Sequence, residues 1–221
     1  MDTPNLGNNI LIIDAYEVTR IGYHTLIKTW NKDIQVIGTG NFADGLRRAK
    51  RGPWIAIIVE LFNLERDGFD VLDQMLMNNL NCPILVCTKI EDESFGIRVI
   101  KRGAAGFICK SAGSQEILNA ISCVTSGRKY LSASLSQKLI NQIQPGYSGQ
   151  LHDTLSDREF QVLQKLAQGV STKEMAAEMN LSAKTVSTYR VRVMKKLGVK
   201  NLVELVEYCV ENGMTKKQAN N

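Results

Sequence analysis

Short apolar runs and longer amphipathic stretches alternate along the first half of the chain. The apolar runs are ILII at 10–13, IQVIG at 34–38, IAIIVEL at 55–61, PILVCT at 83–88 and AGFICK at 105–110. Each run is too short for a helix and is rich in β-branched residues, which is typical of strands buried on both faces of a parallel sheet. Helical periodicity marks the stretches at about 16–30, 42–51, 68–78, 93–102 and 114–126. The pattern predicts an α/β fold in which five parallel strands alternate with helices that cover both faces of the sheet.

The second half of the chain has a different pattern, without β-rich runs. The segment PGYSGQLHD at 145–153 combines proline, glycine and polar residues, which indicates a boundary between domains. Beyond it, Ser156 with Glu159 and Ser171 with Glu174 have the spacing of capping boxes, in which serine and glutamate satisfy each other's backbone N–H groups. Further helix boundaries are predicted by two N-terminal caps, Ser182 and Asn201, and by three glycines at helix ends, Gly169, Gly198 and Gly213.

These signals predict four short helices that share one small core. The apolar positions expected in that core are Phe160, Leu163, Leu166, Ala167, Met175, Ala176, Met179, Val186, Val193 and Leu197. We therefore expect a first domain over residues 8–128, a linker over 129–153 and an all-α domain over 154–216.

Composition narrows the function classes. Of 221 residues, 44% are apolar and 22% are charged, which excludes a disordered or fibrous chain. No apolar run reaches the roughly 18 residues that a membrane span needs, and the polar N-terminus does not resemble a secretory signal, so we expect a cytoplasmic protein. The five cysteines include no CxxC pair and the two histidines stand far apart. We expect no disulfide framework, metal site or cofactor, and no enzyme, since no nucleophile–base pair is evident.

Basic residues gather in one helical segment near the C-terminus. Between residues 184 and 200 no acid occurs, and the basic residues are Lys184, Arg190, Arg192, Lys195, Lys196 and Lys200. A basic stripe on a helix is typical of a nucleic-acid contact, although by itself it is also compatible with a solvated helix face.

Polar side chains follow four of the predicted strands. They are Asp14, Glu60, Thr88 and Lys110. Because ligands and chemistry sit at the carboxyl ends of the strands in an open parallel sheet, two carboxylates, a hydroxyl and an ammonium should meet at one edge.

The order and spacing of these four residues resemble the receiver domain of bacterial two-component response regulators. In that family an acid follows strand 1, a phosphate-accepting aspartate follows strand 3, Thr or Ser follows strand 4 and Lys follows strand 5. The ERDG turn at 65–68 and the RGAAGFICK run at 102–110 add to the resemblance. It implies a flavodoxin-like (βα)5 fold, and it places Phe107 at an aromatic position that reports switching, although a core aromatic is the simpler reading.

Several positions depart from the receiver pattern. Ala15 stands where a second metal-binding acid is expected, and Glu60 replaces the acceptor aspartate. Tyr16 and Glu17 stand where a histidine–proline pair is common, and Leu64 replaces a proline. Losing one carboxylate weakens a Mg²⁺ site, and a nucleophile moved by one methylene loses its attack geometry. Ordinary phosphorylation is therefore not expected.

Two interpretations of Glu60 remain open at this point. Its carboxylate extends toward the place of a phosphoryl group, within reach of Lys110 and Thr88, and so could hold the switch partly on. Alternatively the site has drifted and Glu60 merely pairs with Lys110, since buried carboxylates need a cationic partner.

The segment from Leu155 to Val199 resembles the LuxR-type DNA-binding domain. The resemblance rests on its LSDREFQVL opening, on KTV at 184–186 and on KLGV at 196–199, and NLS at 180–182 has the tight turn of a helix-turn-helix. Together with a receiver it points to the NarL/FixJ class of response regulators. The resemblance implies double-stranded DNA with palindromic half-sites as a partner, and a homodimer paired through the last helix, where Val203, Val206 and Val210 are candidates. Alternatively, this helix only completes the core of the monomer.

A helical wheel divides the predicted recognition helix into faces. With Val186, Val193 and Leu197 inward, Ser187, Thr188 and Val191 are the candidates for reading bases. The candidates for holding phosphates are Lys184, Thr185, Tyr189, Arg190, Arg192, Lys195 and Lys196.

The leading hypothesis is a DNA-binding regulator whose receiver works without conventional phosphorylation. One alternative is a conventional switch that a sensor kinase or a small phosphodonor phosphorylates. Another is an adaptor whose receiver binds a partner regulator.

Overall fold

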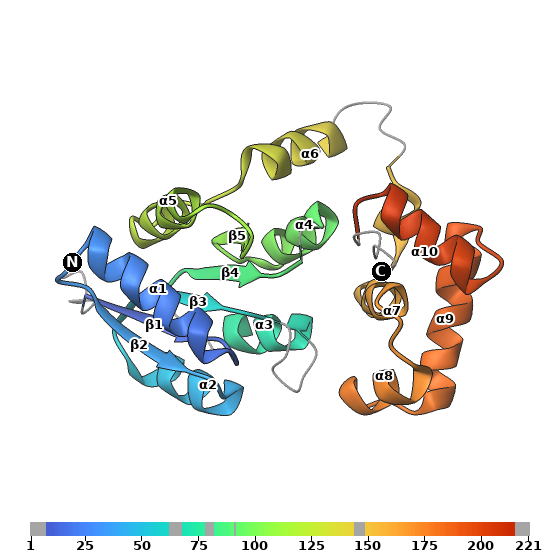
Figure 1. Ribbon diagram of the computed structural model, residues 1–221, viewed down its shortest axis with the longest axis horizontal. Coiled ribbons are helices and arrows are strands. Elements are labelled where there is room, and N and C mark those ends of the chain that lie inside the picture. The colour runs from blue at the N-terminus through green and yellow to red at the C-terminus, as the bar shows by residue number, and fades with distance from the viewer. Residues whose placement is uncertain (1–7, 62–67, 78–81, 91, 144–148, 215–221) are drawn as a thin grey trace, which may run out of the picture. The chain divides into compact units, whose positions relative to one another are not determined.

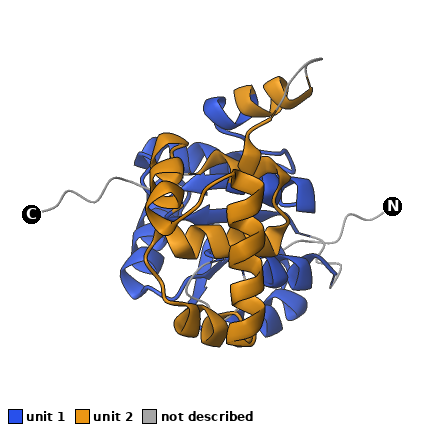
Figure 2. Cartoon of the chain, turned by 90° about the vertical axis from the view of Figure 1, so that its right-hand side faces the viewer, with its two compact units in different colours: residues 1–89, 95–136 blue, residues 90–94, 137–221 orange. Residues whose placement is uncertain are grey.

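The computed structural model describes residues 8–61, 68–77, 82–90, 92–143 and 149–214 (Figure 1). Leu64, the ERDG turn apart from Gly68, and residues 215 and 216 of the predicted second domain lie outside these ranges. The chain divides into two compact units, one of residues 1–89 and 95–136 and the other of residues 90–94 and 137–221 (Figure 2). The boundaries predicted for the domains and linker stay a prediction.

The first unit contains a five-stranded parallel sheet, as the apolar runs predict. Its strands are Asn9–Ile13 (β1), Gln35–Thr39 (β2), Trp54–Val59 (β3), Ile84–Thr88 (β4) and Gly106–Cys109 (β5). Their order across the sheet is β2-β1-β3-β4-β5, and neighbouring strands run parallel. Ile13 at the end of β1 is level with Val59 at the end of β3, so the residues that follow these two strands start from neighbouring points.

Helices cover both faces of this sheet. They are Glu17–Trp30 (α1), Phe42–Arg51 (α2), Gly68–Met77 (α3), Glu93–Arg102 (α4) and Ser114–Thr125 (α5). Side chains of α1 and α5 pack into one buried cluster with Ile10, Ile12 and Ile58 of the sheet. Strand residues alternate between faces, so Ile13 points to the other side, where Gly45 of α2 packs against it. This doubly covered sheet is the predicted fold.

Helices alone make up the described part of the second half. They are Ala133–Ile143 (α6), the 3-10 turn Leu151–Thr154 (η1), Asp157–Ala167 (α7), Thr172–Glu178 (α8), Ala183–Leu197 (α9) and Leu202–Glu211 (α10). The four helices predicted for the second domain are α7 to α10. Most of the predicted linker up to residue 143 is itself helical, as α6.

The predicted caps are present. Both serine–glutamate pairs form reciprocal capping boxes, Ser182 accepts from the Thr185 N–H, and Asn201 accepts from the Glu204 N–H. Gly198 adopts a left-handed φ of 70° at the end of α9, a conformation that favours glycine. Local chemistry therefore fixes where these helices begin and end.

Asn180 makes the turn between α8 and α9. It has a φ of 52°, in the left-handed region that asparagine tolerates better than most residues. The Leu181 N–H then donates back to the carbonyl of Ala176 at 2.9 Å, which ends α8 and starts the chain toward α9. The predicted tight turn at 180–182 is thus confirmed.

The predicted helical core is present apart from one position. Nine of its ten apolar residues are buried, and Ala167 is half-buried because it is the last residue of α7. No helix among the described residues is long and apolar enough to cross a membrane.

Candidate receiver site and nucleic-acid interface

The strand ends of the first unit bring the predicted polar residues together. The Glu60 N–H donates to the Ile13 carbonyl at 2.9 Å, and the Lys110 N–H donates to the Thr88 carbonyl at 2.7 Å. Asp14, Glu60 and Thr88 are buried, with 1%, 2% and 0% of their surface exposed. The ladder of the sheet thus places two carboxylates and a hydroxyl in a buried edge beside one lysine.

The Lys110 ammonium bridges both carboxylates. Its Nζ lies 2.5 Å from Oδ2 of Asp14 and 3.0 Å from Oε2 of Glu60. Burial works to lower the pKa of Lys110, but the hydrogen bond to Asp14 and the charge of Glu60 outweigh it and raise the pKa above its ordinary value. The ammonium therefore stays charged and partly neutralises the site from within.

An arginine that sequence reasoning missed also reaches this loop. Nη1 of Arg20 donates to the carbonyls of Asp14, at 2.7 Å, and Ala15, at 3.1 Å. Gly40 leaves space for it, because a Cβ at that position would lie 3.0 Å from Arg20 Nη1. No local motif marks Arg20, since its contacts depend on how α1 returns over the strand end.

These residues do not fit the Mg²⁺ ion that receiver domains use. Ala15 offers no side-chain oxygen, and Oδ2 of Asp14 is already bonded to the Lys110 ammonium. The other Asp14 oxygen, Oδ1, accepts from the Tyr16 N–H at 2.9 Å. Mg²⁺ requires a near-octahedral set of oxygen ligands, whereas here the Lys110 ammonium is bonded to the carboxylates that would have to supply them.

Phe107 lies in the core of the first unit, with 6% of its surface exposed. Its ring meets Phe95 of α4 edge to face, with centroids 5.9 Å apart. Gly96 is required beside it, because a Cβ there would lie 2.7 Å from the Phe107 ring. The side chain is thus held inward by a close-fitting wall of α4.

The faces of α9 follow the predicted helical wheel. Val186, Val193 and Leu197 are buried. Thr185, Tyr189 and Arg190 are half-buried, and the exposed residues are Lys184, Ser187, Thr188, Val191, Arg192, Lys195 and Lys196. Val191 is 65% exposed, so this face presents an apolar side chain among the basic ones.

Four cations on α9 have no partner among the residues that the structure describes. Within the described ranges, the side chains of Lys184, Arg190, Arg192 and Lys195 make no hydrogen bond or ion pair. Two hydroxyls are used locally, because Thr185 bonds to Ser182 at 2.8 Å and Thr188 donates to the Lys184 carbonyl at 3.0 Å. The exposed face therefore offers free positive charge.

Lys196 differs from the other cations of α9 because it forms an ion pair within the chain, which the sequence pattern did not predict. Its Nζ lies 2.6 Å from Oε2 of Glu159 and 3.3 Å from the Thr154 carbonyl. Burial works to raise the pKa of Glu159, but hydrogen bonds from Lys196 and Ser156 outweigh it and lower the pKa. Lys196 thus ties the end of α9 to the start of α7.

The predicted dimer residues lie on α10. Val203 is 67% exposed, and Val206 and Val210 are half-buried. Leu205 and Cys209 face inward and are fully buried. The helix thus completes the core with one side and leaves apolar surface on another.

Comparison with known proteins assigns the chain to a family. The family described as "Response regulator receiver domain" matches residues 10–122, and "Bacterial regulatory proteins, luxR family" matches residues 153–209. The virulence factors putative positive transcription regulator BvgA of Bordetella pertussis is 34% identical over 94% of this chain and 99% of its own. The chain is a NarL/FixJ-type response regulator. It therefore belongs to a family of DNA-binding transcription factors rather than enzymes.

Solved structures share the fold of this response regulator. RcsB from Salmonella enterica serovar Typhimurium, bound to promoter P1flhDC with the phosphomimetic BeF3-, has a TM-score of 0.71 at 22% identity and covers 92% of this chain and 98% of its own. A structure of two RcsB dimers bound to two parallel DNAs has a TM-score of 0.56 at 21% identity and covers 90% and 96%. At these identities the likeness concerns the fold alone.

Proposed function

We propose that this response regulator controls transcription from palindromic DNA sites as a homodimer, with a receiver that works without aspartyl phosphorylation. The main support for a receiver that works without phosphorylation is the Lys110 ammonium, which bridges Asp14 and Glu60. The four unpartnered cations of α9 support the DNA part. A regulator of this kind meets its DNA in the cytoplasm.

The charges of the receiver site favour phosphorylation independence. A phosphodonor brings a dianionic group, which in receivers is neutralised by Mg²⁺ and lysine together. Here Lys110 already serves two buried carboxylates, and Ala15 supplies no metal ligand. A phosphoryl group on Glu60 would add negative charge to a buried edge where Asp14 and Glu60 already share the Lys110 ammonium, which is costly.

Glu60 itself supplies a standing negative charge beside Lys110. It replaces part of the charge that a phosphoryl group would bring, although a carboxylate has fewer acceptor oxygens. With Phe107 packed inward against Phe95, we propose that the receiver rests in one state suited to DNA binding. In this proposal the five regulatory residues are Asp14, Glu60, Thr88, Phe107 and Lys110.

Acetyl phosphate with Mg²⁺ tests phosphorylation directly. We expect no gain of about 80 daltons, the mass of a phosphoryl group, by intact-protein mass spectrometry. The double variant Ala15→Asp with Glu60→Asp restores both missing acids and is the positive control, which should gain labelling. Labelling of the unaltered protein at Glu60 would instead make it a conventional switch served by a sensor kinase or a small phosphodonor.

The role of the Glu60 charge is tested by Glu60→Gln, which keeps the shape of the side chain. We expect weaker dimerisation and weaker operator binding, measured by sedimentation and by fluorescence anisotropy. Unchanged dimer and operator constants would favour a drifted site in which Glu60 only pairs with Lys110. If the unaltered chain does not bind DNA but does bind another regulator, the adaptor interpretation is favoured.

We propose that α9 enters the major groove with its exposed face. Ser187, Thr188 and Val191 are placed to read base edges, because hydroxyls serve several bases and a valine contacts a thymine methyl. Contacts to phosphates are assigned to Lys184, Thr185, Tyr189, Arg190, Arg192 and Lys195. Lys196, held by Glu159, is reassigned to orienting α9, with any phosphate contact secondary.

We propose that α10 forms the dimer contact. Val203 is exposed and Val206 and Val210 are half-exposed on one side of that helix. A twofold pairing of α10 would set two recognition helices on adjacent half-sites, as the symmetry of a palindrome requires. RcsB, which shares the fold of this chain, binds DNA as dimers, which supports a dimeric state by analogy.

A further inference from the structure

A second basic cluster lies in the first unit, on α2. Four of the last five residues of this helix are basic, namely Arg47, Arg48, Lys50 and Arg51. Cations near a helix C-terminus are stabilised by the helix dipole. The dipole accounts for their presence at that end, but it does not account for the hollow that three of them surround.

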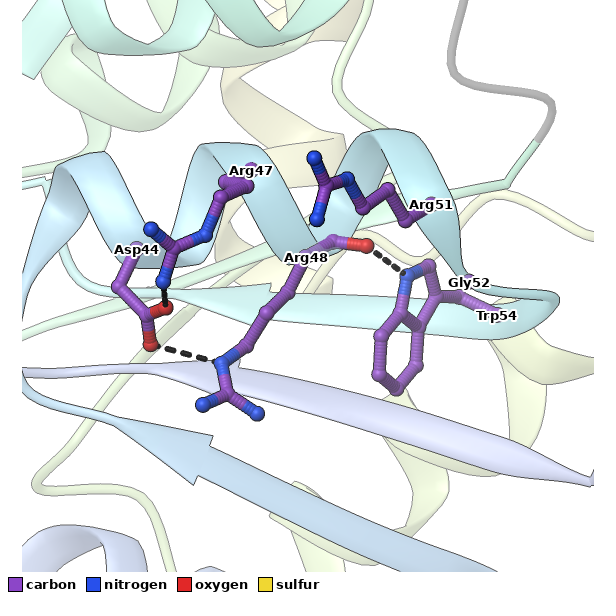
Figure 3. A pocket seen from close by; sticks show the side chains of 6 residues that line it. All are labelled: Asp44, Arg47, Arg48, Arg51, Gly52 and Trp54. Carbon is purple, nitrogen blue, oxygen red and sulfur yellow. Dashed lines mark hydrogen bonds and ion pairs between the residues drawn. The ribbon is translucent and has the colours of Figure 1, made fainter.

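The hollow is a cavity of about 310 Å³ at the C-terminal end of α2. Its lining residues, all close in sequence, are Asp44, Arg47, Arg48, Arg51, Gly52 and Trp54 (Figure 3). Its volume is at the small end of the range of small-molecule sites. Trp54 begins β3, whereas Glu60 follows the other end of that strand, so the cavity is separate from the receiver site.

One wall of the cavity is fixed by the Trp54 indole. Its Nε1–H donates to the Arg48 carbonyl at 2.9 Å, and the residue is only 5% exposed. Gly52 makes room for the ring, because a Cβ there would lie 2.4 Å from the indole. The wall is thus preorganised, and any other residue at position 52 would displace it.

The arginines of the cavity retain most of their hydrogen-bonding capacity. Asp44 accepts one hydrogen bond from Arg47 and one from Nε of Arg48, and the bond to Arg48 is the first cause of a lowered pKa of Asp44. Arg51 makes no hydrogen bond or ion pair with any described residue, and its side chain extends back along α2 toward Arg47 (Figure 3). Each guanidinium has five N–H donors, so these three leave most of theirs unpaired.

We propose that this cavity binds a small phosphate-bearing molecule. Guanidinium groups match the geometry of phosphate oxygens and bind them with paired, charge-assisted hydrogen bonds. Asp44 orients two of the guanidiniums and leaves an excess of two positive charges in the lining. The indole wall suits an organic part next to the phosphate, and a concave site of this volume is too small for a DNA duplex.

Pyrophosphate is the probe for the first test, added to the full-length protein at constant ionic strength. The indole N–H signal of Trp54 is followed by NMR, and that of Trp30, 40% exposed and outside the cavity, is the internal reference. We expect a saturable shift of the Trp54 signal alone. Arg51→Gln should raise the dissociation constant about tenfold, the loss expected for one charge-assisted contact.

Lys50→Gln is the matched control, since it removes the same charge from the same helix but does not line the cavity. It should change the dissociation constant less than about twofold, the size of a screened long-range effect. Equal losses in both variants would show diffuse attraction and overturn the proposal, as would the absence of saturation. If Arg51→Gln instead weakens binding to an unrelated DNA duplex and leaves pyrophosphate binding unchanged, the cluster is a DNA contact and the proposal is wrong.

Discussion

The receiver site and helix α9 both carry functionally placed cations, but the cations of the two regions have opposite surroundings. Lys110 is largely buried and holds two carboxylates of its own chain within 3.0 Å. Lys184, Arg192 and Lys195 are exposed and have no partner among the described residues. A buried charge must be satisfied within the protein, whereas an exposed one remains available to a partner from outside.

The surroundings of a cation therefore indicate different things about function in the two regions. In α9 the free charges indicate an anionic ligand, and the chain belongs to a family of DNA-binding transcription factors. In the receiver, by contrast, Lys110 is already paired within the chain, and this pairing is the basis of our proposal that the site works without phosphorylation. The same residue type therefore supports opposite conclusions in the two regions, and burial decides between them.

The largest effect should come from changing the buried face of α9. Val186 is fully buried, so Val186→Asp places an unpaired charge in the small helical core and should abolish its cooperative unfolding. Val191→Asp, on the exposed face, should keep the melting transition but lose DNA binding. Circular dichroism melts of both variants check this. Normal melting of the Val186 variant would show that the faces of α9 are assigned wrongly.

The next largest effect should come from removing the receiver cation. Lys110→Met leaves Asp14 and Glu60 buried without it, and we expect a loss of about 3 to 5 kcal/mol in the free energy of unfolding. Adding Glu60→Gln to this variant should recover part of the loss. Lys50→Met, an exposed change without a lost ion pair, is the control in urea denaturation. A loss below about 1 kcal/mol, typical of a surface pair, would contradict the description of Lys110 as a buried bridge.

A smaller effect should follow from breaking the pair of Lys196 with Glu159. Lys196→Met should cost about 2 kcal/mol, the size of a hydrogen bond to a charged group. Because the pKa of Glu159 is lowered in the folded state, its contribution is present above its ordinary pKa of 4.5 and is lost as pH falls through the lowered value. Lowering the pH from about 6 to about 3 should therefore reduce the melting temperature of the unaltered protein more than that of the variant. Parallel curves would show that the pair does not contribute.

The smallest effects should separate base reading from phosphate binding. Val191→Ala should change the preferred base by about 1 kcal/mol at one position of each half-site. Lys184→Ala should weaken binding to all sequences and lower the salt slope by about one unit. Selection from randomised sites with each variant, at two salt concentrations, measures both. A new sequence preference in the Lys184 variant, with none in the Val191 variant, would reverse these roles.

Much of the fold could be predicted from the sequence because its signals are local. β-branched runs placed the five strands, and the serine–glutamate pairs placed the starts of α7 and α8. The receiver site could be assembled from four residues, since parallel strands put their carboxyl ends on one edge. The helix α6 within the predicted linker was missed, because no serine–glutamate capping box marks its start, although five of its eleven residues are apolar.

The sequence by itself determined which side chains gather at the receiver edge and which face of α9 is exposed, since strand order and helical period follow from local patterns. Only the tertiary structure decided how their charges pair. In sequence, Lys196 is indistinguishable from its basic neighbours, but in the structure it is bonded to Glu159, 37 positions away. Arg20 and the cavity of α2 likewise depend on close approaches such as those at Gly40 and Gly52. Such contacts are set by packing in three dimensions, which residue type and spacing along the chain do not encode.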